Sequence, residues 1–231
     1  MPKDTEQFET RLGEIRSDLV AQGWRVLDIC ERSFNVFFTG DIDAATEVVS
    51  LDDEVDRIDV QIEKDSVELL GKIAREAIEL SESNLRQILV IVKANNELER
   101  AADCAIAIAE RVKDRAGIDV PETFRVMANS VLGIIRDACN ALDKQDADLA
   151  KLVLRSEDTV RGFKATLLRD AENDIASGSM SVDCGFLLHE IASQCENAAD
   201  HATNIAEQVL YAVTGTIVRH VESGWIELDN S

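Results

Sequence analysis

The chain of 231 residues contains few of the residues that interrupt helices or cross-link a fold. It has two prolines, five cysteines and ten aromatic residues (seven Phe, two Trp and one Tyr). No proline stands between Pro2 and Pro121 or after Pro121, so nothing in the sequence breaks long helices. The cysteines lack CxxC spacing and are odd in number, which argues against a zinc knuckle or a disulfide framework and predicts buried free thiols.

Basic residues are also scarce, since 24 Lys and Arg stand against 45 Asp and Glu and give a formal net charge of −21. An acidic surface repels phosphodiester backbones and anionic lipid headgroups, which excludes nucleic-acid partners and membrane-surface roles. No apolar run approaches the roughly 18 residues of a membrane span, and the N-terminus lacks a basic start followed by an apolar run. We expect a cytoplasmic protein without membrane insertion.

What the sequence does contain is the periodicity of long bundle helices. Small and apolar residues recur at alternating steps of three and four from Leu98 to Val112 and from Ile191 to Ala212, which predicts narrow, alanine-rich buried seams. Helix breaks fall near residues 39–41, 71 or 81–84, 117–121, 144–146 and 177–179, which gives six helical segments. The predicted caps are Asp41, Asp119 and Asp146 at helix starts and Gly215 past the last long helix.

The chain also repeats itself. Residues 40–48 match residues 145–153 at an offset of 105, and residues 99–110 match residues 196–207 at an offset of 97, with eight of twelve positions identical in the second pair. Two matched blocks in the same order indicate a duplication. We therefore predict an all-α fold of two tandem repeated three-helix bundles with six long helices. Its parts are residues 1–117, residues 118–215 and a C-terminal tail of residues 216–231.

Each repeat carries a stripe of acidic residues beside its alanine seam. The members of the two stripes are Glu99, Asp103 and Glu110, and Glu196, Asp200 and Glu207. The second helix of the first repeat adds Asp52 and Asp56, again four residues apart. Carboxylates at i,i+4 repel each other, and a bound cation would offset the repulsion. Oxygen ligands of this kind suit Mg²⁺, Ca²⁺, Mn²⁺ or iron. The alternative is a solvated surface in which these acids pair with Arg57, Arg100 or Arg161.

Residues 196–207 (ENAADHATNIAE), followed by Val213-Thr214-Gly215 and Val218-Arg219-His220, resemble the C-terminal signature of the PhoU family of phosphate-transport regulators. Residues 99–110 resemble the family's N-terminal motif, and the resemblance extends over nearly the whole chain. It implies two three-helix bundles whose E(D)xxxD motifs hold multinuclear metal clusters, in a cytoplasmic protein that is often a homodimer. It further implies a regulator without enzymatic activity that contacts the ATPase subunit of the phosphate ABC transporter and a phosphate-sensing histidine kinase. Similar proteins restrain phosphate uptake and keep the phosphate-starvation response off.

The stripes and the resemblance together give nine candidate metal ligands, with the identity of the metal left open. They are Asp52, Asp56, Glu99, Asp103, Glu110, Glu157, Glu196, Asp200 and Glu207. The second repeat departs from the family pattern, because Glu157 matches Asp52 but Arg161 stands where Asp56 has its counterpart. We therefore expect the second site to be weaker, or empty with Arg161 bridging Glu196 or Asp200.

Two other classes of protein remain open. A di-iron enzyme of ferritin-like architecture also gathers acids from bundle helices, but none of His189, His201 and His220 follows an acid by three residues, so the usual Glu-x-x-His ligands are missing. A purely structural helical adaptor would present the acids to solvent. No nucleotide-binding loop and no GxSxG motif is present, so we predict no catalytic residues and no organic cofactor. His201 is interpreted either as a support for Asp200 or as an exposed side chain.

Overall fold

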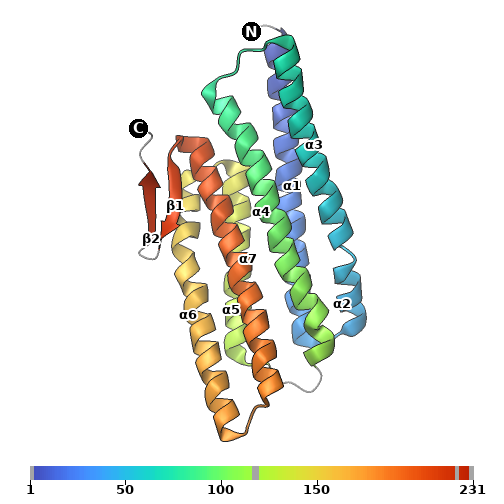
Figure 1. Cartoon of the computed structure of the whole chain (residues 1–231), viewed down its shortest axis with the longest axis vertical. Helices are drawn as coiled ribbons and strands as arrows, with labels where there is room; N and C mark the ends of the chain where they lie inside the picture. The colour runs from blue at the N-terminus through green and yellow to red at the C-terminus, as the bar shows by residue number, and fades with distance from the viewer. Residues whose placement is uncertain (1–2, 116–119, 222–223, 229–231) are drawn as a thin grey trace.

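The computed structural model describes residues 3–115, 120–221 and 224–228. Six long helices dominate it (Figure 1), as the sequence predicts. They are α1 (Lys3–Thr39), α3 (Asp52–Glu76), α4 (Glu82–Glu110), α5 (Glu122–Lys144), α6 (Ala147–Ser177) and α7 (Val182–Thr214). The shorter elements are α2 (Ile42–Val49), the 3-10 helix η1 (Arg111–Arg115), and the strands β1 (Ile217–Val221) and β2 (Gly224–Leu228).

Local sequence signals explain where the helices begin and end. Asp41 caps α2 by accepting a hydrogen bond from the Ala44 amide at 3.0 Å, and Asp146 caps α6 through two amides. Gly215 follows α7 in the left-handed conformation, which glycine adopts without steric cost. These three caps are confirmed. The predicted cap Asp119 lies outside the described residues, and Pro121 precedes the first turn of α5.

The helices form two three-helix bundles, which confirms the predicted architecture. The first contains α1, α3 and α4 and the second α5, α6 and α7, and α4 and α7 lie against each other between them (Figure 1). Six alanines in or next to the predicted seams of these two helices are almost fully buried: Ala101, Ala102, Ala105, Ala198, Ala199 and Ala202. Because alanine side chains are small, two helix backbones can approach closely along such a seam. One continuous hydrophobic core therefore runs through both repeats.

The tail after Gly215 was not placed by the sequence, and it begins with an antiparallel hairpin. Strand β1 pairs with β2 in the register Ile217 to Leu228, and β1 packs on α7. β1 is five residues long, which is too short for strand periodicity to stand out in a helical sequence. Among the described helices, none combines the length and the hydropathy that crossing a membrane requires.

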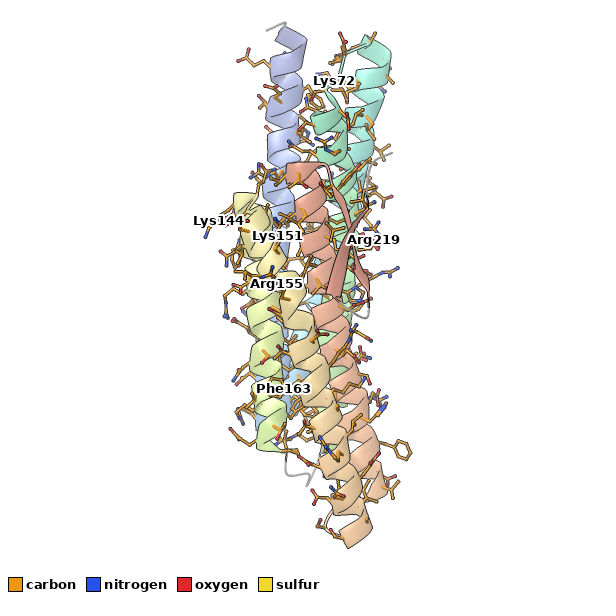
Figure 2. The ribbon with its side chains drawn as sticks, turned by 90° about the vertical axis from the view of Figure 1, so that its left-hand side faces the viewer. Lys72, Lys144, Lys151, Arg155, Phe163 and Arg219 are labelled. Carbon is orange, nitrogen blue, oxygen red and sulfur yellow. The ribbon has the colours of Figure 1, made fainter. Side chains whose placement is uncertain are left out.

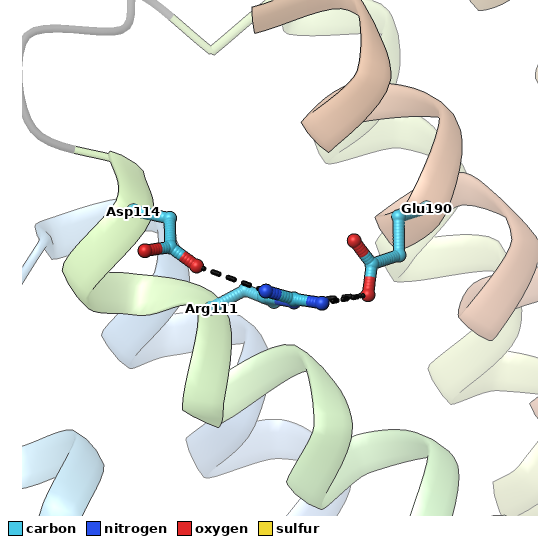
Figure 3. A network of polar contacts seen from close by, with 3 residues as sticks. All are labelled: Arg111, Asp114 and Glu190. Carbon is cyan, nitrogen blue, oxygen red and sulfur yellow. Dashed lines mark hydrogen bonds and ion pairs between the residues drawn. The ribbon is translucent and has the colours of Figure 1, made fainter. Parts of the chain in front are cut away.

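A polar bridge joins the two repeats at the end of α4 (Figure 3). The Arg111 guanidinium donates to the Glu190 carboxylate of α7 from Nε at 2.9 Å and from Nη2 at 2.6 Å, and to Asp114 of η1 from Nη1 at 3.1 Å. The hydrogen bond to Glu190 is the main reason that the pKa of Arg111 is raised. This cation fixes the end of the first repeat against the second.

All five cysteines are free and buried, which confirms the prediction of unpaired thiols. Burial raises the pKa of the Cys104 and Cys139 thiols to about 12, so neither is a thiolate at neutral pH. The cysteines serve as small core residues of the helices that carry them.

The alanine seam predicts a sensitivity to added volume. Ala102→Leu inserts three carbons at a position with no exposed surface, and we expect it to lower the free energy of unfolding by about 1–3 kcal/mol. Ala74→Leu makes the same change at an exposed position of α3 and should change it by less than about 0.5 kcal/mol. Urea unfolding followed by circular dichroism measures both values. Equal effects would show that the seam is not closely packed.

Candidate metal centre

The predicted ligands of the first repeat come from two adjacent helices. Asp52, Asp56 and Asp59 follow one another at steps of four and three along α3, and Glu99 and Asp103 lie four apart on α4. α3, which forms the right-hand edge of the molecule in Figure 1, packs against α4. Two helices that each bear a row of acids therefore present these rows to each other.

These carboxylates interact strongly enough to perturb one another's protonation. The pKa of Asp52 is raised, first because burial disfavours the charged form and then by the charges of Asp56 and Asp103. Partial burial and the neighbours Asp103, Asp59 and Asp56 likewise raise the pKa of Glu99. The structure thus brings Asp52, Asp56, Glu99 and Asp103 into one cluster of mutually repelling groups.

Two other charges lie at the border of this cluster. Glu110, at the end of α4, adds to the charges that raise the pKa of Asp52. At Asp103, desolvation and the charge of Asp56 raise the pKa, and His201 and Arg100 oppose them. Desolvation and the repulsion from Asp56 together therefore outweigh the cationic neighbours on α4 and α7.

Unsatisfied oxygen atoms fit a cation at this place. Asp52 Oδ1 is buried and has no hydrogen-bond partner among the described atoms, and the same is true of the Asn95 Oδ1 carbonyl on α4. The Asn95 amide nitrogen donates to the Asp59 carboxylate at 2.6 Å, and the Asn95 carbonyl oxygen is left without a donor. Buried oxygen acceptors without donors are the ligands that hard cations take.

The donor set fits such a cation, but the site is not preformed. Within the described ranges, no three His, Cys, Asp or Glu side chains are already arranged to hold a metal ion. Ligation would require the carboxylates of the cluster to turn toward a common ion. The solvated alternative pairs these acids with Arg57, Arg100 or Arg161. Among the described contacts only Arg161 forms such a pair, with Glu196 of the second repeat.

The second repeat neutralises its acids with its own cations. Lys164 Nζ lies 2.6 Å from Glu196 Oε2, and Arg161 Nε lies 3.6 Å from Glu196 Oε1. The expected bridge from Arg161 to Glu196 is therefore confirmed. Asp200 is exposed beside this pair. The backbone of Glu157 belongs to α6, but its side chain lies outside the described part of the structure, so its predicted role as a ligand stays a prediction.

Glu207 differs from its repeat counterpart Glu110 in having a cation beside it. Only 6% of Glu207 is exposed, and its Oε2 accepts a hydrogen bond from Arg219 Nη1 at 3.0 Å. Arg219 projects from the C-terminal hairpin (Figure 2). The hairpin, which the sequence could not place, thus supplies the partner of a predicted metal ligand.

His201 proves to be neither fully exposed nor unpartnered. Its Nδ1 lies 2.8 Å from Glu97 Oε2, and Asn204 donates to the same oxygen at 3.0 Å. Burial raises the pKa of Glu97, but the hydrogen bonds from His201 and Asn204 outweigh it, and the net shift is downward. The interpretation of His201 as an exposed histidine is wrong. It ties α7 to α4 and lies close enough to Asp103 to act on its protonation.

Three residues of these clusters were missed by the sequence analysis. Asp59 and Lys164 follow Asp56 and Arg161 by three residues, so extending each stripe by one turn finds them. The third, Glu97, contacts His201, which lies 104 positions away on another helix, and no spacing within one helix could reveal that contact.

Comparison with known families decides the assignment of the chain. A family model described as "PhoU domain" matches the chain twice, over residues 20–112 and over residues 124–209. The chain belongs to the PhoU family. The two matches fall on the two bundles, so the family found from the sequence and the repeated fold are both confirmed.

Curated members of the PhoU family match along nearly their whole length. The chain is 28% identical over 229 residues to "Phosphate-specific transport system accessory protein PhoU homolog 1" of Thermotoga maritima, covering 96% of this chain and 97% of that relative. It is 25% identical over 226 residues to the PhoU accessory protein of Escherichia coli K12, covering 96% and 91%.

Solved structures agree with the fold. PhoU from Pseudomonas aeruginosa superposes with a TM-score of 0.84 at 28% identity, covering 90% of this chain and 100% of that one. The phosphate transport system regulatory protein PhoU from Streptococcus pneumoniae also superposes with a TM-score of 0.84, covering 92% of this chain and 99% of that one. Its identity to this chain is 21%, so it supports the fold alone.

The contrast between the repeats predicts opposite effects of one substitution at equivalent positions. In metal-free buffer at pH 7, Glu99→Gln should raise the free energy of unfolding by about 0.5 kcal/mol, because it removes a charge from a repelling cluster. Glu196→Gln should lower it by about 0.5–1 kcal/mol, because it breaks the pairs with Lys164 and Arg161.

The pH dependence of the first effect follows from the raised pKa of Glu99. The native state binds this proton more readily than the unfolded state, so the charge costs stability at pH 7 and the cost vanishes as the pH falls below the ordinary value of about 4.3. Thermal unfolding of the wild type and of Glu99→Gln, in the presence of chelator at pH 7 and at pH 4, measures this cost. A Glu99→Gln protein that is less stable than wild type at pH 7 would refute the repelling cluster.

Proposed function

We propose that this chain regulates phosphate uptake and has no catalytic activity of its own. The observation that carries the proposal is the match of both halves to one family whose curated members are named accessory proteins of the phosphate-specific transport system. In this role the protein links the ATPase subunit of the phosphate ABC transporter to a phosphate-sensing histidine kinase and keeps the phosphate-starvation response off. It acts in the cytoplasm, as a homodimer.

The first acidic cluster is the proposed metal centre. Asp52, Asp56, Glu99 and Asp103 would hold Mg²⁺, Mn²⁺, Ca²⁺ or iron ions, with Glu110 at the border of the cluster. The ion would supply positive charge where the chain itself supplies too little. The carboxylates of α3 and α4 would orient toward it, and the attraction would draw these helices together.

The second acidic cluster has less need of an ion. Glu196 is already paired with Lys164 and Arg161, and Glu207 with Arg219. A metal ion at Glu157, Glu196 and Asp200 would have to compete with these internal cations. We therefore assign the stronger site to the first repeat.

The arrangement of the acids also argues against an oxygen-activating di-iron enzyme. Such sites lie inside a four-helix core and use a Glu-x-x-His pair. Here Asp56 and Asp103 are exposed and Glu99 is half-buried, at the seam of two helices. His201 is hydrogen-bonded to Glu97, and it does not form part of a Glu-x-x-His pair.

Metal binding is tested by thermal unfolding of chelator-treated protein with added MnCl₂ or MgCl₂. An ion present at 100 times its Kd should stabilise the wild type by about 2.7 kcal/mol. The double variant Glu99→Gln/Asp103→Asn should lose this gain, because its ligands are gone. Its matched control in the second repeat, Glu196→Gln/Asp200→Asn, should keep it. If the metal ion stabilised the first-repeat variant but not the control, the ion would bind in the second repeat and our assignment would be wrong.

The regulatory role is tested in the bacterium that carries the gene. Deletion should raise both phosphate uptake and transcription from a starvation-responsive promoter in phosphate-rich medium, and the wild-type chain should restore repression. Labelled phosphate uptake and a promoter fusion measure the two effects. Unchanged uptake and unchanged transcription after deletion would contradict the proposal.

A further inference from the structure

An apolar groove lies at the hairpin where α6 turns into α7. It encloses about 370 Å³ and is lined mainly by Leu168, Ala171 and Ile175 of α6 and by Val182 and Phe186 of α7. Phe186 is 70% exposed and Val182 is 53% exposed, although both are large apolar side chains. Two such residues at i,i+4 beside a cavity form a patch of the kind that binds a partner.

The groove is a built feature of the packing between the two helices. A Cβ on Gly185 would come within 2.5 Å of Ile175 Cδ1, so the glycine lets α6 and α7 approach closely with Ile175 lying across it. Phe186, the next residue, stands beside this contact and lines the groove. In Figure 1 the α6–α7 hairpin extends at the bottom past the adjacent ends of α2 and α4.

The surroundings of the groove are strongly acidic. Residues 165–190 contain one basic residue, Arg169, and five acidic ones, of which only Glu190 is paired with a cation from elsewhere in the described chain, Arg111. Glu172 lines the groove itself, and none of Asp170, Glu172 and Asp183 forms an ion pair within the described contacts. Residues 68–93, which include the α3–α4 hairpin of the first repeat, contain four basic and four acidic residues. The acidity is therefore particular to the second hairpin.

We propose that this groove binds an amphipathic helix of a partner protein, with a leucine-rich face on Phe186 and Val182 and with Lys or Arg residues on its flanks. A groove between two packed helices accepts a third helix through its i, i+3, i+4 and i+7 side chains. The acidic surroundings attract basic flanks and repel acidic ones. A second copy of this chain is a poor occupant of this groove, because a symmetric contact here would bring the same acidic hairpin against it.

The inference deepens the proposed function by naming a partner surface and its chemistry, and it rests on that function only in that the protein works by contacting other proteins. The test uses neither a transporter nor a kinase. Its failure would therefore remove the groove from the mechanism and leave the regulatory role to be judged by the deletion experiment.

The probe is a fluorescent 18-residue peptide of Leu and Lys with leucines at helical spacing, titrated against the full chain by fluorescence anisotropy. Two further peptides serve as controls: a scrambled sequence of the same composition, and a version in which Glu replaces every Lys. Phe186→Ala should weaken binding of the first peptide about tenfold or more, equal to about 1.4 kcal/mol. Leu89→Ala, at the equivalent and 53% exposed position of the first repeat, should bind like wild type.

Each outcome decides for or against the groove. Strong binding of the Leu/Lys peptide that is lost in Phe186→Ala and absent with the Glu peptide supports it. Equal binding by wild type and Phe186→Ala, or by the ordered and scrambled peptides, would overturn it, since charge alone would then explain the binding. Sedimentation that shows a dimer of the wild type lost in Phe186→Ala would overturn it as well and assign the groove to a second copy.

Discussion

Repulsion between carboxylates on neighbouring helices is the constraint around which this molecule is built. Each repeat places acids at i,i+4 beside a seam of alanines, where a helix pair packs closely and water is partly excluded. Charges in such a seam cost free energy unless a cation lies among them. The two repeats meet this same requirement in different ways, and the difference organises the rest of the structure.

In the second repeat the chain supplies the cations itself. Lys164 and Arg161 reach Glu196 from α6, and Arg219 reaches Glu207 from the hairpin that packs on α7. In the first repeat, burial and then repulsion between acids raise the pKa values of Asp52, Glu99 and Asp103, and the cations Arg100 and His201 offset this only in part at Asp103. The duplicated fold thus holds one internally neutralised cluster and one in which the charge remains.

The sequence predicts the helices well because their signals are local. A seam with steps of three and four follows from the helical period, and the caps at Asp41, Asp146 and Gly215 depend on side chains a few residues away. The acidic stripes are local patterns too, and the bridge from Arg161 to Glu196 followed from comparing the repeats. The pairs Glu97–His201 and Glu207–Arg219 join separate elements, and no periodicity encodes which element lies opposite.

Glu99 and Glu196 show that equivalent acids in the two repeats can have different electrostatic surroundings. They stand in blocks that are identical at eight of twelve positions, on helices that share the same alanine seam. One has a raised pKa in a group of acids, and the other is held by two cations. The cause lies on the facing helix, where α3 offers Asp56 and Asp59 while α6 offers Arg161 and Lys164. An E(D)xxxD motif on one helix therefore gives only half of a site, and the residues of the facing helix decide whether the acids are left for a cation or already paired.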